Sequence, residues 1–326
     1  VVIAEAGATL ADIQAAAAQV DRLFPLSYAS EGTARIGGAL AVNSGGLAVL
    51  RYGTARELCL GLEAVLPDGK IWHGLRRLRK DNTGYDLRNL LLGSEGTLGV
   101  ITAASLRLYP RPRHLSTAMI AVTGPAAALT LLSRARDHFG EAVSAFELMS
   151  GAGLHFLTET GKGPRQPFAD TPDWMVLIEA GLNSDTDADA AMTALFAAAM
   201  DADDAQDGVS AASEAQRAEL WAVRETIPAA NATIGASASQ DIALPLGEVA
   251  EFIEQAGTAI AAIDPTIRIN AFGHLGDGNL HYNTFPAQGR TREDYAGVAP
   301  DVTRTVHDLV ASLGGSFSAE HGVGRL

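Results

Sequence analysis

In the first third of the chain, short apolar strands alternate with one helix and with stretches rich in glycine. Alternating apolar positions predict strands over Leu58–Leu66 and Val100–Leu108. Thr9, followed three positions later by an acidic residue, predicts the start of a helix that continues to about Leu23. Residues 29–53 contain so many glycines that we predict little regular structure there.

The pattern changes after Pro112, one of two closely spaced prolines that predict a boundary. Beyond it, apolar runs that predict strands alternate with alanine-rich stretches that predict helices, which indicates an open α+β domain. We therefore expect two domains, residues 1–113 and residues 114–326. The predicted strands of the second domain are Thr117–Val122, Val143–Met149, Trp174–Ala180 and Ile242–Leu244, and its predicted helices are Ala126–His138, Asp185–Met200, Ser213–Arg224, Val249–Ile263 and Val302–Leu313.

Composition narrows the classes of protein that remain. The chain has 326 residues, 47% of them hydrophobic, which is enough for two folded cores. A net charge of −14, without any basic stripe, argues against nucleic acid and against an anionic membrane surface as partners. No apolar run is long enough for a transmembrane helix and no signal peptide is recognisable, so we expect a cytoplasmic location. The one cysteine, Cys59, excludes an internal disulfide and a cysteine-based zinc site.

The most informative run is Phe272–Asn283, which reads FGHLGDGNLHYN. Asp277-Gly278 is a preferred pair for a two-residue hairpin turn, because both central residues of that turn need positive φ. Counting outward from this turn places His274 opposite His281, with their β-carbons about 5 Å apart. Two imidazoles at that separation suit a divalent transition metal. A histidine taken alone is more often a core or surface residue than a ligand, and the glycines could serve only the turn.

A second cluster of glycine and histidine, SAEHGVG, occupies Ser318–Gly324. It offers Glu320 as a third metal ligand and His321 as a base. Three protein ligands leave one coordination position for substrate, which is the arrangement of a catalytic metal site. Adjacent side chains of a strand point to opposite faces, so both residues can reach one site only if this segment bends, as Gly322 and Gly324 allow.

Three blocks of sequence together carry a family resemblance. They are RIGGALAVNSGGLAVLRYG at Arg35–Gly53, LRKDNTGYDLRNLLLGSEGTLGVIT at Leu78–Thr102, and the pair GHLGDGNLH with SAEHGVG. They resemble the FAD-linked oxidases of the vanillyl-alcohol oxidase superfamily, in the branch of D-2-hydroxyglutarate dehydrogenase, D-lactate dehydrogenase and the glycolate oxidase flavin subunit. The blocks follow the order of the family over nearly the whole chain.

The resemblance implies a different function for each of the two domains. Residues 1–113 would be the second FAD-binding subdomain, and residues 114–326 a ferredoxin-like α+β cap that carries substrate and metal. The first FAD subdomain would precede Val1, and the cap would be cut short at its C-terminus, so we expect this chain to be a fragment of a longer protein.

By motif match, the resemblance assigns the cofactor contacts to the first two blocks. Backbone amides of glycine-rich loops can donate to flavin and phosphate oxygens at close range. Each glycine taken alone would equally fit an ordinary tight turn. The residues assigned to FAD are Gly37, Gly38, Asn43, Gly45, Gly46, Tyr52, Gly53, Glu95, Gly96, Thr97, Gly99 and Ile101.

The same match assigns the chemistry of the cap. The metal, zinc or manganese, would be held by the two histidines of the hairpin and by the later glutamate. His321 would act as acid and base, and Asn283 would contact substrate. Arg224 would bind the substrate carboxylate, since its planar fork meets a carboxylate with two parallel bonds. A surface salt bridge at the end of a helix is the alternative interpretation of Arg224.

The activity implied by the resemblance is FAD-dependent oxidation of a D-2-hydroxy acid to the 2-oxo acid, with hydride transfer to flavin. The electron acceptor would be an electron-transfer flavoprotein, a cytochrome or a quinone. Ser239 stands where dehydrogenases of 2-hydroxyglutarate tend to have a lysine, so a monocarboxylate such as D-lactate stays open as the substrate. Two other hypotheses of function remain: a metal-binding or assembly subunit without FAD, and a metal-dependent hydrolase that uses a zinc-bound water.

Overall fold

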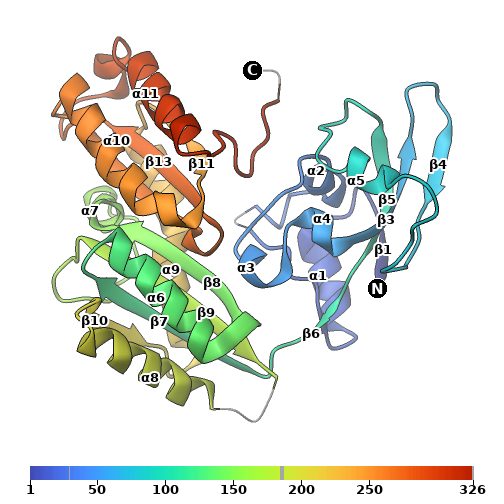
Figure 1. The fold of residues 1–326 in the computed structure, drawn as a ribbon, viewed down its shortest axis with the longest axis horizontal. Helices are drawn as coiled ribbons and strands as arrows, with labels where there is room; N and C mark the ends of the chain where they lie inside the picture. The colour runs from blue at the N-terminus through green and yellow to red at the C-terminus, as the bar shows by residue number, and fades with distance from the viewer. Residues whose placement is uncertain (29, 184–186, 325–326) are drawn as a thin grey trace. The chain divides into compact units, whose positions relative to one another are not determined.

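The computed structural model describes residues 1–28, 30–183 and 187–324, which form two compact units (Figure 1). The first unit comprises Val1–Pro112 together with the chain from Glu320. The second unit comprises Arg113–Ala319. The last segment therefore belongs to the first unit, whereas the sequence analysis assigned it to the second domain.

The first unit is built on a four-stranded antiparallel sheet in the order β1-β5-β3-β4. Its strands are β1 Val2–Glu5, β5 Val100–Leu106, β3 Cys59–Val65 and β4 Ile71–Gly74, and a separate pair is formed by β2 Arg22–Leu23 and β6 Tyr109–Pro110. The alternating apolar positions predicted β3 and β5 correctly to within two residues at each end. Their inward side chains, such as Leu62 and Ala104, are completely buried in the core of this unit.

The helices that the structure describes in the first unit are α1 Leu10–Ala18, α2 Ile36–Ala41, α3 Val49–Tyr52, α4 Ala55–Leu58 and α5 Leu87–Leu91. The predicted N-cap is confirmed, because the Thr9 hydroxyl accepts the amide of Asp12 at 3.1 Å. The predicted end of this helix is wrong. Helix α1 stops at Ala18, and the left-handed φ of 51° at Asp21 turns the chain before β2.

The prediction of little regular structure over residues 29–53 is also wrong where α2 and α3 form. In α2, a β-carbon on Gly37 would lie only 2.6 Å from the β-carbon of Ala6. This glycine thus permits close helix packing, a long-range contact that its local sequence does not reveal. Ala29 lies outside the described residues.

The second unit contains a seven-stranded antiparallel sheet in the order β10-β7-β9-β8-β12-β13-β11. The strands are β7 His114–Val122, β8 Val143–Ser150, β9 Trp174–Leu182, β10 Ala205–Ser210, β11 Asp241–Ala243, β12 Arg268–Gly273 and β13 Asn279–Phe285. The four strands predicted for this unit are confirmed, and most extend beyond the predicted ends because the neighbouring residues also pair in the ladder.

The helices of the second unit are α6 Pro125–Phe139, α7 Gly151–Thr160, α8 Ala188–Asp201, α9 Glu214–Ile234, α10 Val249–Ile263 and α11 Ala299–Ser312. Helix α10 has the predicted bounds. Helix α9 continues ten residues beyond its predicted end at Arg224, in spite of Pro228 in its interior. The predicted start of α8, Asp185, lies outside the described residues. In the described part of the chain, every helix is too short or too polar to span a membrane.

Helix α9 and helices α6 and α8 lie on opposite faces of this sheet, and Figure 1 shows α9 behind it. The register pairs Glu147 with Leu177 and Ala145 with Glu179. Directly opposed residues of an antiparallel pair point to the same face, so both glutamates point to one face. Both carboxylates accept hydrogen bonds from α9, which therefore covers that face.

Candidate functional site

The turn between β12 and β13 differs from the predicted turn. In the register, Phe272 rather than His274 lies opposite His281. The connecting residues Leu275–Asp277 form a short 3-10 turn, and Gly278 alone takes a left-handed φ, of 83°. The prediction of a two-residue turn with positive φ at both central positions is therefore wrong.

Tertiary contacts explain the longer connection. The side chain of Leu275 is buried in the turn. A β-carbon on Gly273 would lie 2.6 Å from the carbonyl oxygen of Asn279, so the two strands approach too closely there for any larger residue. The amides of Asp277 and Gly278 donate within the turn to the carbonyls of His274 and Leu275, each at 3.2 Å. Burial and close backbone packing thus override the local preference of the Asp-Gly pair.

The two histidine rings nevertheless lie close together. The ring centroids of His274 and His281 are 5.8 Å apart and the ring planes are inclined by 77°. The ring of Phe272 lies 5.0 Å from that of His281 and forms an apolar wall beside it. His274 is buried and His281 half-buried, so both imidazoles are partly shielded from water.

Each histidine has its own carboxylate partner on the same ring atom. Nδ1 of His274 lies 2.6 Å from Oε1 of Glu147, and Nδ1 of His281 lies 3.4 Å from Oδ1 of Asp241. A carboxylate holds the Nδ1–H tautomer, which makes Nε2 the ring atom able to bind a metal ion. Histidines that bind metal ions usually have such a carboxylate partner at the other ring nitrogen.

The partner of His274 is itself part of a buried ion pair. Glu147 is completely buried, and its Oε2 accepts a hydrogen bond of 2.8 Å from Nε of Arg224. Burial raises the pKa of Glu147, but the charges and hydrogen bonds of His274 and Arg224 outweigh burial and hold that pKa at about 2. Glu147 is therefore a carboxylate at any physiological pH.

Arg224 lies in the middle of α9 and is buried, so its interpretation as a surface salt bridge at a helix end is wrong. Its guanidinium stands 4.9 Å from the ring centroid of Phe272. Among the described residues, Glu147 is its one hydrogen-bonding partner, and that bond uses Nε. The terminal amino groups are the part of the fork that can meet an added carboxylate.

Asn283 lies two residues beyond His281 on β13 and so points to the same face of the sheet. Its side-chain oxygen accepts the amide of Gln240 at 3.2 Å. Asp241, next to Gln240, lies opposite His281 in the register of β11 with β13. Gln240, directly before β11, is thus the neighbour of Asn283, and Asp241, the first residue of β11, carries the carboxylate that faces His281.

Glu147 and Asp241 contact the two histidines but were not predicted from the sequence as site residues. Glu147 stands between Phe146 and Leu148 in a strand that is buried throughout. An acid inside such an apolar run is a signal in itself, because a buried carboxylate requires partners. The identity of those partners was not visible, since they lie 77 and 127 residues further along the chain.

The predicted third ligand and base follow directly after the second unit. The amide of Ala319 donates to the carbonyl of Asp241 at 3.1 Å, which attaches the end of this unit to β11. Glu320 is the next residue along the chain and begins the segment that belongs to the first unit. Residues Ala319–His321 form a bend rather than a strand, as the sequence required if both side chains are to reach one site.

Within the first unit, the segment from Glu320 has fixed contacts of its own. Oε1 of Glu320 accepts the amide of Gly46 at 2.8 Å. The carboxylate of Glu95 accepts the amides of Val323 and Gly324 at 3.0 and 2.8 Å. Two residues assigned to FAD, Gly46 and Glu95, therefore also hold the C-terminal segment.

The two glycine-rich blocks assigned to the cofactor are neighbours in the first unit. The amide of Gly93 donates to Leu40 and that of Glu95 to Ala41, at 3.1 and 2.9 Å. A β-carbon on Gly38 or on Gly96 would meet no atom within 4 Å. The backbone is therefore open to a close approach at one glycine of each block.

Several other residues assigned to FAD have evident structural roles. Tyr52 is buried against Tyr109, with ring centroids 4.7 Å apart, and Ile101 is buried in β5. Oδ1 of Asn43 accepts the amide of Arg56, and the Thr97 hydroxyl donates to the carbonyl of Ser94. The remaining assigned glycines are Gly45, beside the Glu320 carboxylate; Gly53, which ends α3 with a φ of 79°; and Gly99, packed against the carbonyl of Val65.

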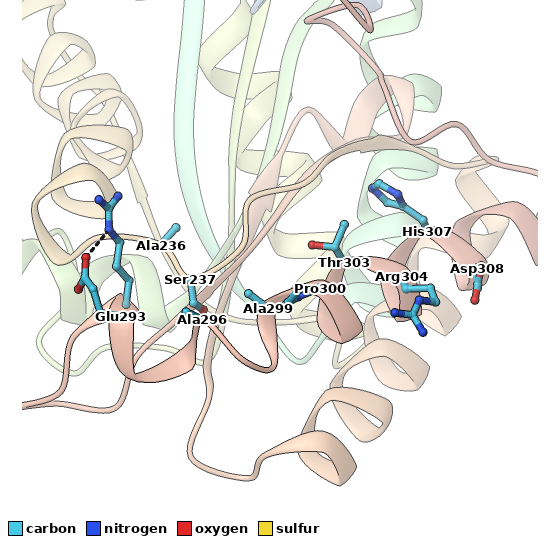
Figure 2. Close-up of a pocket in the computed structure, with 11 residues that line it drawn as sticks. Ala236, Ser237, Glu293, Ala296, Ala299, Pro300, Thr303, Arg304, His307 and Asp308 are labelled. Atoms are coloured by element: carbon cyan, nitrogen blue, oxygen red, sulfur yellow. Dashed lines mark hydrogen bonds and ion pairs between the residues drawn. The ribbon is translucent and has the colours of Figure 1, made fainter. Parts of the chain in front are cut away.

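The second unit has an open pocket of about 890 Å³ beside α11 (Figure 2). Figure 2 shows Thr303 and His307 on α11 and Glu293 near the other end of the pocket. Glu293 forms an ion pair with Arg292, which also lines the pocket. Gln240 bonds both Thr303 and His307, at 3.1 and 2.9 Å. The residues that line this pocket, among those the structure describes, include none of the predicted site residues.

Comparison with protein families gives two matches. The model for FAD linked oxidases, C-terminal domain, matches residues 111–326. The model for the FAD binding domain matches residues 1–74.

Comparison with curated proteins gives relatives over the whole chain. The mitochondrial D-2-hydroxyglutarate dehydrogenase of Bos taurus is 36% identical and covers 99% of this chain and 58% of its own length. The D-2-hydroxyglutarate–pyruvate transhydrogenase DLD3 of Saccharomyces cerevisiae is 32% identical and covers 98% of this chain and 65% of its own length. The chain thus spans about three fifths of the length of the relatives that it matches.

Among solved structures, p-cresol methylhydroxylase with substrate bound superposes with a TM-score of 0.72 at 13% identity, over 98% of this chain and 68% of that one. This likeness confirms the expected fold of the FAD-linked oxidases, with mixed helix and sheet.

Proposed function

Because the chain belongs to the family of FAD-linked oxidases, we propose that it is the larger part of an FAD-dependent dehydrogenase that oxidises a D-2-hydroxy acid. The observation that carries this proposal is the pair His274 and His281, each with a carboxylate at Nδ1. The relatives named after D-2-hydroxyglutarate support the class of substrate.

A divalent metal, zinc or manganese, would be held by His274, His281 and Glu320, each of which offers one ligand atom. Two imidazoles and one carboxylate are a donor set that both ions accept, and three protein ligands leave a position for substrate. When bound, the ion would act as a Lewis acid that lowers the pKa of the substrate hydroxyl. Glu147 and Asp241 would orient the two imidazoles through Nδ1.

Arg224 would bind the substrate carboxylate. Its Nε is already committed to Glu147, which leaves the terminal amino groups to donate two parallel hydrogen bonds. Asn283, on the same sheet face as His281, would contact the substrate beside it. Burial of the arginine strengthens such a charge-assisted bond, because water competes little for it.

His321 would accept the proton of the substrate hydroxyl, since imidazole can take up a proton near neutral pH. FAD would accept the hydride of the substrate α-carbon. The two neighbouring glycine-rich blocks of the first unit would hold FAD, with Gly38 and Gly96 as the places of closest approach. The reduced protein would then pass its electrons to an electron-transfer flavoprotein, a cytochrome or a quinone.

The experiment uses the complete protein with its flavin. Under anaerobic conditions, His321→Ala should abolish the loss of flavin absorbance on addition of D-2-hydroxy acids while FAD remains bound. His155→Ala, a change of an exposed histidine on α7, is the control and should react like the wild type. A wild-type rate in His321→Ala would remove the proposed base.

Substrate choice is tested in the same assay. Without a lysine at Ser239, D-lactate should reduce the flavin at least as fast as D-2-hydroxyglutarate, and Ser239→Lys should shift the preference toward the dicarboxylate. A strong preference of the wild type for D-2-hydroxyglutarate would contradict this choice of substrate.

A further inference from the structure

Glu147 joins two functional groups that come from different parts of the chain. Its Oε1 lies 2.6 Å from Nδ1 of His274, and its Oε2 accepts Nε of Arg224 at 2.8 Å. No part of the Glu147 side chain is exposed to solvent. The two oxygens of one carboxylate thus contact two different residues: His274, the proposed metal ligand, and Arg224, the proposed substrate-binding residue.

The sheet explains why these three residues meet. Strand β12 pairs with β8 so that Gly273 lies opposite Leu148. One residue beyond this pair on each chain segment, His274 lies beside Glu147. Arg224 of α9 packs over the same face of the sheet and contacts the same carboxylate. The arrangement is therefore held by a strand, a turn and a helix together, and it excludes water.

We propose that Glu147 is a positioning residue that orients both the metal ligand His274 and the substrate-binding Arg224. This inference rests on the proposed function. Through Nδ1, the carboxylate fixes the tautomer and the plane of the imidazole, and so the direction of its Nε2. Through Nε, it fixes the rotation of the guanidinium fork and so the direction of the terminal amino groups.

A second buried carboxylate on the same face provides the matched control. Glu179 on β9 accepts hydrogen bonds from Arg217 at 2.6 Å and from Trp221 at 2.8 Å, both on α9. It also accepts the hydroxyl of Thr117 at 3.0 Å. Glu179 thus anchors the same helix but, among its partners, has no histidine and no residue assigned to substrate.

The decisive variant is Glu147→Gln, made in the complete, flavin-loaded protein. A glutamine has one acceptor oxygen in place of two, so it cannot serve both His274 and Arg224. We expect the affinity for Zn²⁺ alone, measured by competition with a chelator, to fall about 10–100-fold, as for other residues that orient metal ligands. The KM for D-lactate should rise in the same variant.

Two further variants separate positioning from a general loss of structure. Glu179→Gln should leave the Zn²⁺ affinity within about threefold of the wild type, although it disturbs the same helix. Arg224→Met should raise the KM but keep the Zn²⁺ affinity, because Glu147 still holds His274. If Glu147→Gln fails to fold, Glu147→Asp keeps the charge and should weaken Zn²⁺ binding through its shorter reach.

The outcomes are distinguishable. Equal Zn²⁺ affinity in the wild type and in either Glu147 variant would overturn the inference and leave the proposed dehydrogenase intact. Equal loss of Zn²⁺ affinity in Glu147→Gln and Glu179→Gln would show a structural effect only, and would also overturn it. A wild type that reduces its flavin with substrate but binds no Zn²⁺ or Mn²⁺ would refute the metal site itself, and the inference with it.

Discussion

Two regions of one sheet face look alike until their partners are compared. Around Glu147 and around Glu179, a buried carboxylate on a central strand accepts a hydrogen bond from an arginine of α9. Around Glu179 the other partners are Trp221 and Thr117, which are fixed structural groups. Around Glu147 the other partner is His274, whose ring lies beside a second imidazole.

The difference teaches how to identify a site among buried charges. A buried acid with an arginine partner is weak evidence for function, because the same pair can simply anchor a helix. What distinguishes Glu147 is its partner His274, a residue type that can bind a metal ion through Nε2 while Nδ1 contacts a carboxylate.

Replacing His274 should cause the largest loss of bound metal. In the complete protein, His274→Ala takes away a ligand, so we expect a larger loss than the about 10–100-fold typical of residues that only orient ligands. Elemental analysis of zinc and manganese per bound flavin measures it. His155→Ala is the control, and a metal content equal to that of the wild type in His274→Ala would remove this residue from the ligand set.

The two arginines should differ in their effect on stability. Arg224→Met removes the arginine partner of a completely buried carboxylate and leaves it only the contact with His274, so we expect the free energy of unfolding to fall by about 3–5 kcal/mol. After Arg217→Met, Glu179 keeps two hydrogen bonds, and we expect a loss of about 1–3 kcal/mol. Urea unfolding of metal-free protein gives both values, and equal losses would contradict the contrast.

Lowering the pH should reduce the stability that the Glu147 carboxylate contributes to the fold. The pKa of this carboxyl is held at about 2 in the folded chain, below its ordinary value of 4.5. A depressed pKa contributes stability that is complete above the unfolded pKa and is lost as pH falls toward the folded pKa. We expect about 3 kcal/mol to disappear between pH 4.5 and 2 in metal-free protein. Denaturant titrations across that range should show a flatter profile in Glu147→Gln; an unchanged slope would contradict the assignment.

A small change beside Glu179 should leave the metal site untouched. Trp221→Phe removes one donor to this carboxylate and keeps the aromatic ring, so the expected loss of stability is about 1–2 kcal/mol. Zn²⁺ affinity should stay at the wild-type value. A fall in Zn²⁺ affinity here would mean that α9 transmits any disturbance to the histidines, which would weaken the distinction between the two carboxylates.

Local patterns predicted much of the fold. Helix α10 has the predicted bounds, Val249–Ile263, because its apolar residues repeat at helical spacing and one face is buried. Strands β3 and β5 follow from alternation. The short helix α2 could not be predicted, since its Gly37 serves a contact with Ala6 that lies 31 residues earlier in the sequence.

In the candidate site, too, long-range contacts could not be predicted from local sequence. The proximity of His274 and His281 follows from the short segment that contains both, although the turn itself depends on the burial of Leu275. The partners Glu147 and Asp241 come from other strands, so no local pattern connects them with the histidines. Glu320, His321 and the residues assigned to FAD stay predictions.

The central claim is that the histidine pair holds a metal ion needed for flavin reduction by a D-2-hydroxy acid. The most direct measurement is the anaerobic rate of flavin bleaching by D-lactate or D-2-hydroxyglutarate in the complete protein, before and after treatment with a chelator. We expect bleaching to stop when the metal is removed and to return when Zn²⁺ or Mn²⁺ is added back. An undiminished rate in the metal-free, flavin-loaded protein would contradict it.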